Sequence, residues 1–162
     1  MIQDSLIALL HEKDLYQISV RELCAKAQVN RTTFYKYYNS PIDLLKEIDS
    51  DYRDTILRIF QNTDTHLSLE NFLCYIKEHR NLTLIVTSSQ THSLLQNDDN
   101  FLADILIQMH PGEDDPDKYQ YISQFYGCGT IALLREWLTK SNPEPPSYIA
   151  KMIRNLCHYQ EH

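Results

Sequence analysis

Residues 19–38 bring together the side-chain types that proteins use to contact nucleic acid. Arg31 can donate two parallel hydrogen bonds to a guanine edge, and Lys36 can neutralise a phosphate. Thr32 and Thr33 can contact a phosphate, a base edge or a thymine methyl group. The chemistry that this stretch could carry is therefore recognition of the major groove of DNA.

The distribution of charge supports a polyanionic partner at this place. The whole chain of 162 residues carries a net charge of −7, yet residues 23–42 contain three basic residues and no acidic one. Residues 1–48 hold six basic and six acidic groups, whereas residues 49–162 hold nine and sixteen. Because the acidic remainder should repel DNA, only the first part of the chain is expected to bind it.

Two short helical patterns must position these side chains, with a tight turn between them. Ser19 can cap the first pattern, and Glu22, three residues later, completes a capping box. The apolar periodicity breaks at Gln28 and Val29, and Asn30 can cap the second pattern. Two capped helices joined by so short a turn predict a helix-turn-helix, whose second helix enters the major groove.

The second helical pattern has an inward and an outward side. Phe34 and Tyr38 lie four residues apart and share one face, which we expect to point into the domain. The residues expected to contact DNA are outward or at helix ends: Ser19, Lys26, Arg31, Thr32, Thr33, Tyr35, Lys36, Tyr37 and Asn39. Similar patterns occur in helical proteins that do not bind DNA, so a helical module that binds a protein partner is the alternative.

Helical patterns on both sides allow a three-helix unit to close around this motif. An apolar pattern covers residues 2–10, and Ser40 can cap a further helix that begins at Pro41. With these flanks, residues 18–45 resemble the DNA-binding domain of the TetR family of bacterial transcriptional regulators. The resemblance includes the threonine and aromatic positions of the recognition helix.

Two departures from the family pattern affect backbone contacts with DNA. Members usually carry a basic arm before the first helix, whereas this chain begins almost inside it. Many members also place a phosphate-binding lysine where this chain has Pro41. We expect that phosphate to be held by nearby groups such as Lys36 and Asn39, or by the helix N-terminus at Pro41.

The resemblance implies an all-α fold in two parts. These are a three-helix helix-turn-helix domain at residues 1–48, and a helical bundle domain for dimerisation and ligand binding at residues 49–162. It further implies a repressor that binds a palindromic operator as a homodimer and is released or modulated by a small-molecule effector. Residues 126–138 and the following proline-rich turn are similar to a Firmicutes subgroup that includes regulators of dihydroxyacetone metabolism. For that subgroup a partner protein can replace the metabolite.

Helical periodicity predicts the remaining elements and a surface for a second copy. Helices are expected over residues 2–13, 20–28, 31–38, 41–61, 69–79, 81–89, 99–109, 118–140 and 146–159, with Ser68 capping the fifth. The helix over residues 118–140 is apolar on more than one side, and the last helix has one full apolar face, so we expect the two to form a four-helix interface between two copies. The expected contacts are Tyr126, Gly129, Leu133, Trp137, Ile149, Met152, Ile153 and Leu156. The alternative is that these faces form a wholly internal core.

An effector pocket is implied by the resemblance, among the central helices. Its candidate residues are Phe72, Tyr75, His79, Phe101 and Met109. Each of these side chains fits an ordinary hydrophobic core equally well.

Other classes of function lack support in the sequence. No nucleophile elbow, P-loop or His-Glu-x-x-His motif occurs, so we expect no enzyme and no cofactor. The seven histidines do not pair with cysteines at metal-ligand spacing, and we expect no metal. The four cysteines lie far apart and are expected to be mainly buried thiols. Without a long apolar stretch or signal peptide, the expected location is the cytoplasm.

Overall fold

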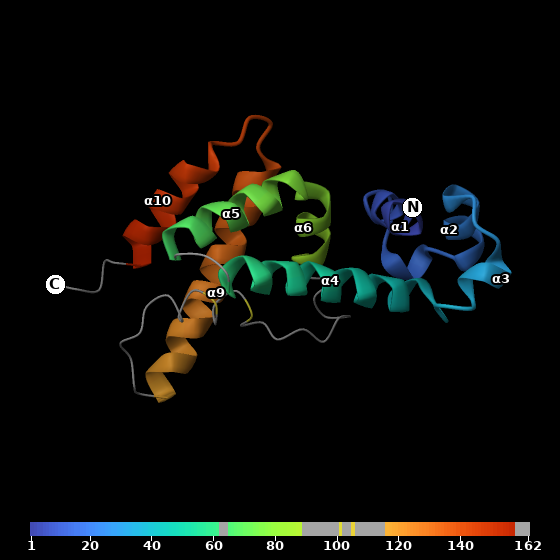
Figure 1. The fold of residues 1–162 in the computed structure, drawn as a ribbon, viewed down its shortest axis with the longest axis horizontal. Helices are drawn as coiled ribbons and strands as arrows, with labels where there is room; N and C mark the ends of the chain where they lie inside the picture. Colours follow the sequence, from blue (N-terminus) through green and yellow to red (C-terminus); the bar gives the residue numbers. More distant parts are fainter. Residues whose placement is uncertain (62–64, 89–100, 102–104, 106–115, 158–162) are drawn as a thin grey trace. The chain divides into compact units, whose positions relative to one another are not determined.

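The computed structural model describes residues 1–61, 65–88, 101, 105 and 116–157. Within these ranges every regular element is a helix, which confirms the predicted all-α class. The helices (Figure 1) are α1 (Ile2–Leu10), the 3-10 turn η1 (Leu15–Gln17), α2 (Val20–Ala27), α3 (Arg31–Phe34), α4 (Pro41–Gln61), α5 (Thr65–Glu78), α6 (Arg80–Val86), α9 (Pro116–Thr139) and α10 (Pro146–Cys157).

The predicted helix boundaries differ from the observed ones at a few places. The predicted helix over residues 99–109 lies outside the described residues apart from two positions. α3 ends at Phe34 and is followed by turn residues rather than continuing to residue 38. The prediction that Ser68 caps α5 is wrong, because α5 begins at Thr65 and Ser68 is a buried residue inside it.

The chain divides into two compact units that alternate along the sequence. One unit consists of Met1–Ile56 and Asn81–Leu95, and the other of Leu57–Arg80 and Gln96–His162. The expected boundary after residue 48 falls inside α4, and α6 groups with the first unit although it follows α5 in the chain.

The first unit has a hydrophobic core formed mainly by α1, α2 and the start of α4. Its buried members recur at helical spacing, which places one apolar face of each helix inward. They are Leu6, Leu9, Leu15, Ile18, Leu23, Cys24, Phe34, Leu44, Leu45, Ile48 and Ile85. Ile85 comes from α6, and Leu82 of the same helix packs against this core. A buried hydrogen bond of 3.1 Å between the hydroxyls of Tyr52 and Thr83 also joins α4 to α6.

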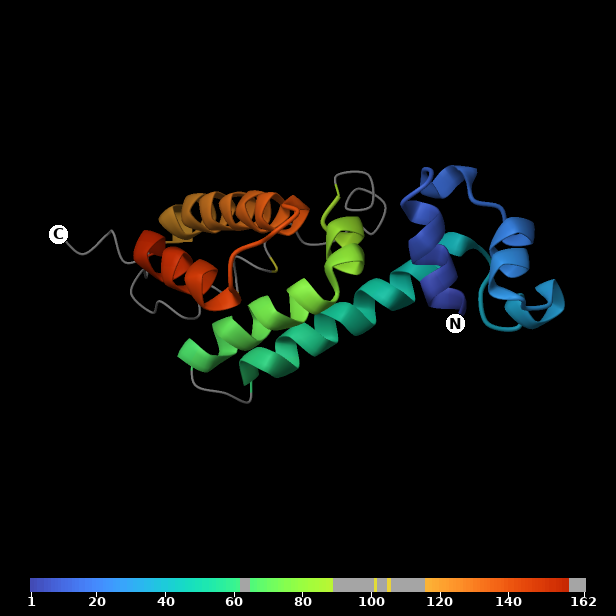
Figure 2. The ribbon, with the colours of Figure 1, turned by 90° about the horizontal axis from the view of Figure 1, so that it is seen from above.

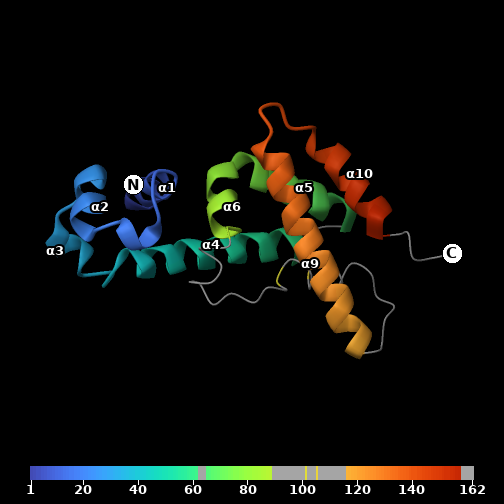
Figure 3. The ribbon, with the colours of Figure 1, turned by 180° about the vertical axis from the view of Figure 1, so that it is seen from behind.

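The second unit is built around α5, α9 and α10. α5 and α10 lie side by side (Figures 2 and 3) and pack against each other. The buried side chains of α5 follow a strict helical stripe, and those of α9 and α10 face it. They are Leu69, Phe72, Leu73, Ile76, Leu134, Trp137, Leu138, Ile149, Ala150 and Ile153.

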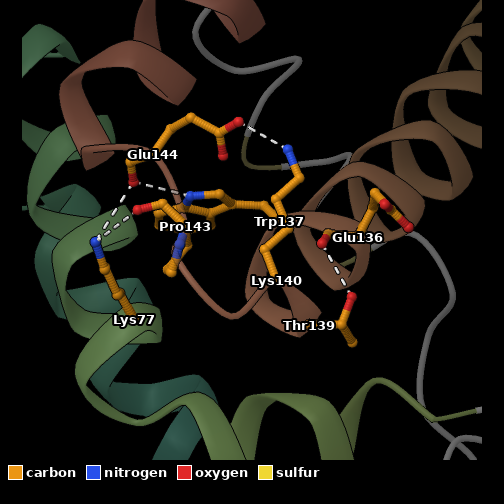
Figure 4. A network of polar contacts seen from close by, with 7 residues as sticks. All are labelled: Lys77, Glu136, Trp137, Thr139, Lys140, Pro143 and Glu144. Carbon is orange, nitrogen blue, oxygen red and sulfur yellow. Dashed lines mark hydrogen bonds and ion pairs between the residues drawn. The ribbon is translucent and has the colours of Figure 1, made fainter.

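A polar network fixes the turn between α9 and α10 against α5 (Figure 4). The indole N–H of Trp137 donates to the carbonyl of Glu144 at 3.0 Å, and Lys77 lies 5.8 Å from the centre of the Trp137 ring. Lys77 also donates to the carbonyls of Pro143 and Glu144, each at 3.4 Å. These bonds satisfy turn carbonyls that a proline-rich connection cannot pair internally.

Two further sequence expectations concern cysteines and membranes. Cys24 is buried as expected, but Cys74 and Cys128 are exposed, so the expectation of buried thiols is wrong for these two. Both lie on the outward sides of helices whose opposite sides form the core. Among the described residues, no helix is both long and apolar enough to cross a membrane.

Candidate nucleic-acid interface

The helix that precedes the turn is capped as the sequence predicts. The Ser19 hydroxyl accepts a hydrogen bond from the backbone N–H of Glu22 at 3.2 Å. The Glu22 carboxylate does not return a bond to the backbone N–H of Ser19, as a full capping box would. It accepts instead from the Lys13 ammonium at 2.5 Å. The ion pair connects α2 to the turn that follows α1, so α2 is held by a neighbouring segment as well as by its cap.

The turn between the two helices depends on one unusual backbone conformation. Gln28 has φ 55° and ψ 37°, in the left-handed region, and it is the one described non-glycine residue with positive φ. This conformation ends α2 and lets the N–H of Val29 donate to the carbonyl of Cys24 at 3.0 Å. Asn30 then caps α3 as predicted, its side-chain oxygen accepting from the N–H of Thr32 at 2.8 Å.

One buried aromatic ring anchors α3 and leaves the polar residues outward. Phe34 is 1% exposed and belongs to the core of the first unit. Tyr38 is half-buried, and its ring centre lies 5.5 Å from that of Phe34, so the predicted inward face is formed. The side chains predicted to contact DNA are all exposed: Ser19, Lys26, Arg31, Thr32, Thr33, Tyr35, Lys36, Tyr37 and Asn39.

The basic residues of this surface are not equally free. Lys26 pairs with Glu12 at 3.0 Å, and this ion pair lowers the pKa of the Glu12 carboxyl. Arg31 and Lys36, by contrast, form no ion pair with any described residue. Of Lys26, Arg31 and Lys36, the two residues on and just after α3 therefore offer unpaired positive charges to a polyanion.

The segment that follows α3 is tied to α4 by two hydrogen bonds. The Tyr38 hydroxyl donates to the Glu47 carboxylate at 2.8 Å, which raises the pKa of Tyr38 to about 12. The backbone N–H of Asn39 donates to the Asp43 carboxylate at 3.1 Å. Sequence reasoning missed both bonds, because nothing in the pattern shows which outward residues of α4 meet the end of the recognition segment.

The N-terminus of α4, where the sequence suggests a phosphate site, carries a carboxylate in its first turn. Ser40 caps the helix as predicted, accepting from the N–H of Asp43 at 3.3 Å. The Asp43 carboxylate sits in the same first turn, where the helix dipole already stabilises it. A phosphate would have to approach this carboxylate, so the helix end is a poor substitute for the missing lysine.

The residues predicted for a dimer interface fall into two groups. Trp137, Ile149 and Ile153 are at most 4% exposed within one copy, which leaves them little surface for a second one. Tyr126, Leu133 and Met152 are half-buried, and Gly129 and Leu156 are exposed. Gly129 has no atom within 4 Å of the place where a Cβ would stand, so no helix of the same copy approaches it closely.

The candidate pocket residues on α5 contact other aromatic rings. Phe72 is buried, and its ring centre lies 5.6 Å from that of Phe60. The ring centres of Tyr75 and His79 lie 4.4 Å apart, and His79 is exposed. Phe101 is half-buried, and Met109 lies outside the described residues. In the part of the chain that the structure describes, no group of three or more His, Cys, Asp or Glu is placed to hold a metal ion.

Comparisons with known proteins relate this chain to transcriptional regulators. Residues 63–159 match the family TetR_C_8, described as a transcriptional regulator C-terminal region. The HTH-type transcriptional regulator YxbF of Bacillus subtilis strain 168 is 24% identical over 169 aligned residues, which cover 96% of this chain. The same alignment covers 43% of that protein, so the chain spans less than half the length of this relative.

Solved structures of regulators share the fold. A TetR transcriptional regulator from Streptococcus agalactiae 2603V gives a TM-score of 0.73 at 21% identity, covering 96% of this chain and 90% of its own. The fatty acid degradation regulator FadR from Bacillus halodurans gives 0.69 at 17% identity, covering 99% and 98%. The dihydroxyacetone kinase operon activator DhaS gives 0.55 at 17% identity, covering 96% and 90%.

These comparisons agree with the resemblance of residues 18–45 and with the helix-turn-helix geometry. Since the family match extends over more than half of the 162 residues, the chain belongs to the TetR family of transcriptional regulators.

Proposed function

We propose that this protein is a DNA-binding regulator whose recognition segment, residues 31–37, enters the major groove. The observation that carries the proposal is the arrangement around Phe34. This ring is buried, while Arg31, Thr32, Thr33 and Lys36 are all exposed on a segment with two unpaired positive charges. A buried anchor holds the segment in place, and the exposed side chains supply donors for base edges and phosphates.

The operator is proposed to be a near-palindrome bound by a homodimer. A two-fold symmetric pair presents two recognition segments, so the centres of the half-sites should lie about 34–36 Å apart, one helical turn, or a multiple of it. Membership in a family of transcriptional regulators supports this proposal. A single copy offers one capped recognition segment in its described residues and therefore reads one half-site.

The surface proposed for dimerisation is the outward side of α9. Tyr121 and Phe125 are 76% and 75% exposed, far more than large aromatic rings in a core. Further along the same side Cys128, Gly129 and Ala132 are exposed and small. In a two-fold pair of antiparallel helices, the aromatic end of one copy meets the small-residue end of the other, so this surface complements itself.

We also propose that the protein represses transcription and that an effector binding to the second unit modulates this repression. The names of two structural neighbours, a fatty acid degradation regulator and a dihydroxyacetone kinase operon activator, support control of a metabolic operon. The described pocket candidates are Phe72 and Tyr75 on α5, His79 directly after it, and Phe101. Such a ligand acts only through different affinities for two conformations. Because DhaS is named an activator, a promoter-reporter assay with and without the protein is the measurement that distinguishes repression from activation.

The experiment that tests DNA binding is a salt series with the purified protein and the DNA upstream of its own gene. A regulator loses affinity linearly in log salt, with a slope of about 0.9 per phosphate contact. A fixed random duplex of the same length and composition should bind more weakly. If the two duplexes bind equally weakly and without salt dependence, the helical protein-interaction module becomes the better description.

A further inference from the structure

The recognition segment needs an external support, because its helix is very short. α3 contains four residues, Arg31–Phe34, and turn residues follow it. A single helical turn has no stability of its own in water, since nucleation costs more than one hydrogen bond returns. Phe34 anchors the front of the segment in the core. Its rear end must be fixed by other contacts.

Two bonds to α4 provide that support. The Tyr38 hydroxyl donates to Glu47 Oε1 at 2.8 Å, and the Asn39 N–H donates to Asp43 Oδ2 at 3.1 Å. Asp43 and Glu47 are four residues apart on α4 and therefore share one face of the helix. Both acceptors are carboxylates, and hydrogen bonds to charged acceptors are roughly twice as strong as those between neutral groups.

We propose that Tyr38 is a positioning residue for DNA recognition, which acts by fixing the rear of the recognition segment to Glu47 on α4. The inference rests on the proposed function and assigns the hydroxyl of Tyr38 a task that its aromatic ring does not perform. The ring packs 5.5 Å from Phe34 and 6.4 Å from Tyr37 and would do so as a phenylalanine. The hydroxyl adds a directional bond that sets the angle between the segment and α4.

The angle matters more for base contacts than for phosphate contacts. A bidentate bond from Arg31 to a guanine requires placement within about half an ångström, whereas a lysine near a phosphate tolerates displacement. Loss of the Tyr38–Glu47 bond should therefore weaken specific binding and leave non-specific binding nearly unchanged. A general loss of folding would weaken both kinds of binding together.

The test uses the full chain, Tyr38→Phe, Glu47→Gln and two probes. One probe is a duplex selected by the wild-type protein from a randomised library, and the other is its scrambled sequence. Tyr38→Phe should lower affinity for the selected duplex about three- to tenfold, which is the range for one lost hydrogen bond. The affinity for the scrambled duplex and the salt slope should not change. Glu47→Gln keeps an acceptor oxygen and should retain the sequence preference. Tyr148→Phe, which removes an exposed hydroxyl from α10, is the matched control.

Amide hydrogen exchange gives a second measurement that needs no DNA. With Tyr38→Phe, the N–H of Asn39 and the amides of residues 35–38 should exchange faster, while those of the α1 and α2 cores keep their protection. Unchanged exchange, or an equal loss of affinity for both duplexes, would overturn the positioning role. If the wild-type protein binds no duplex in a salt-dependent way, the proposed function fails. The exchange result still decides whether Tyr38 fixes the segment.

Discussion

At the residue scale, the candidate interface separates side chains that hold the fold from side chains that can recognise DNA. Phe34 is buried, while its neighbours Arg31 and Thr33 are exposed. Lys26 looks equivalent to Lys36 in the sequence, but it is engaged with Glu12 at 3.0 Å. A phosphate would have to compete with that carboxylate, so Lys26 should contribute less to DNA affinity than Lys36.

Arg31→Ala and Lys36→Ala should therefore have different effects on DNA binding. Loss of Arg31 removes a base contact, so affinity for the selected duplex should fall by about 1–3 kcal/mol and sequence preference should relax. Loss of Lys36 should weaken binding to every duplex and reduce the salt slope by about one phosphate contact. Fluorescence anisotropy over a salt series measures both quantities. Lys26→Ala is the control with the smaller expected change, and identical behaviour of all three variants would contradict the assignment.

The Tyr38–Glu47 bond should also make stability depend on alkaline pH. The folded state raises the pKa of Tyr38 from 10.0 to about 12, chiefly through the hydrogen bond to Glu47, so it favours the protonated phenol. The contribution of the Tyr38–Glu47 bond to stability is complete below pH 10 and is lost as pH rises through about 12. The difference in free energy of unfolding between wild type and Tyr38→Phe should shrink over this interval. Urea unfolding at several pH values measures it, and a constant difference would contradict the assignment.

At the element scale, caps and one left-handed residue define the helix-turn-helix. Ser19, Asn30 and Ser40 each satisfy an N–H at the start of a helix. Gln28 ends α2 at φ 55°, a conformation that disfavours residues with a Cβ. α6 supplies Ile85 to the core of the first unit. This unit is therefore completed by an element that lies beyond α5 in the chain.

Replacing Gln28 with glycine should stabilise the protein. The left-handed conformation costs a residue with a Cβ about 1 kcal/mol, and glycine avoids most of this cost while gaining some freedom in the unfolded chain. The expected net gain is about 0.5 kcal/mol in the free energy of unfolding. Gln28→Ala keeps the Cβ and serves as the control, with no expected gain. Chemical denaturation of both variants measures the difference, and equal stabilities would argue against the assigned turn geometry.

At the scale of the whole molecule, symmetry connects partner and target. A palindromic operator requires two copies, and the outward side of α9 is the surface in the described residues that combines large exposed rings with small neighbours. Several residues that looked available in the sequence, such as Trp137 and Ile153, instead build the core of one copy. The dimer surface we propose is therefore narrower than the apolar pattern of the last two helices.

Phe125→Glu should convert the dimer to a monomer. The ring is 75% exposed in one copy, so a carboxylate costs little there, whereas two buried charges near a two-fold axis repel each other. Light scattering coupled to gel filtration measures the mass, and operator affinity should fall with it. Asn71→Glu on α5 adds the same charge at another exposed position and should remain dimeric. A dimeric Phe125→Glu protein would show that another surface joins the copies.

The sequence by itself determined the local structure of the candidate interface. The caps at Ser19 and Asn30, the break after α2 and the inward position of Phe34 depend on interactions within about four residues, and these can be recognised from spacing. Only the tertiary structure decided which outward residues meet. It placed Lys26 against Glu12 and Tyr38 against Glu47, buried Trp137 within one copy and left Cys128 exposed. The physical reason is that periodicity identifies an apolar face, whereas the packing of distant elements determines what covers it.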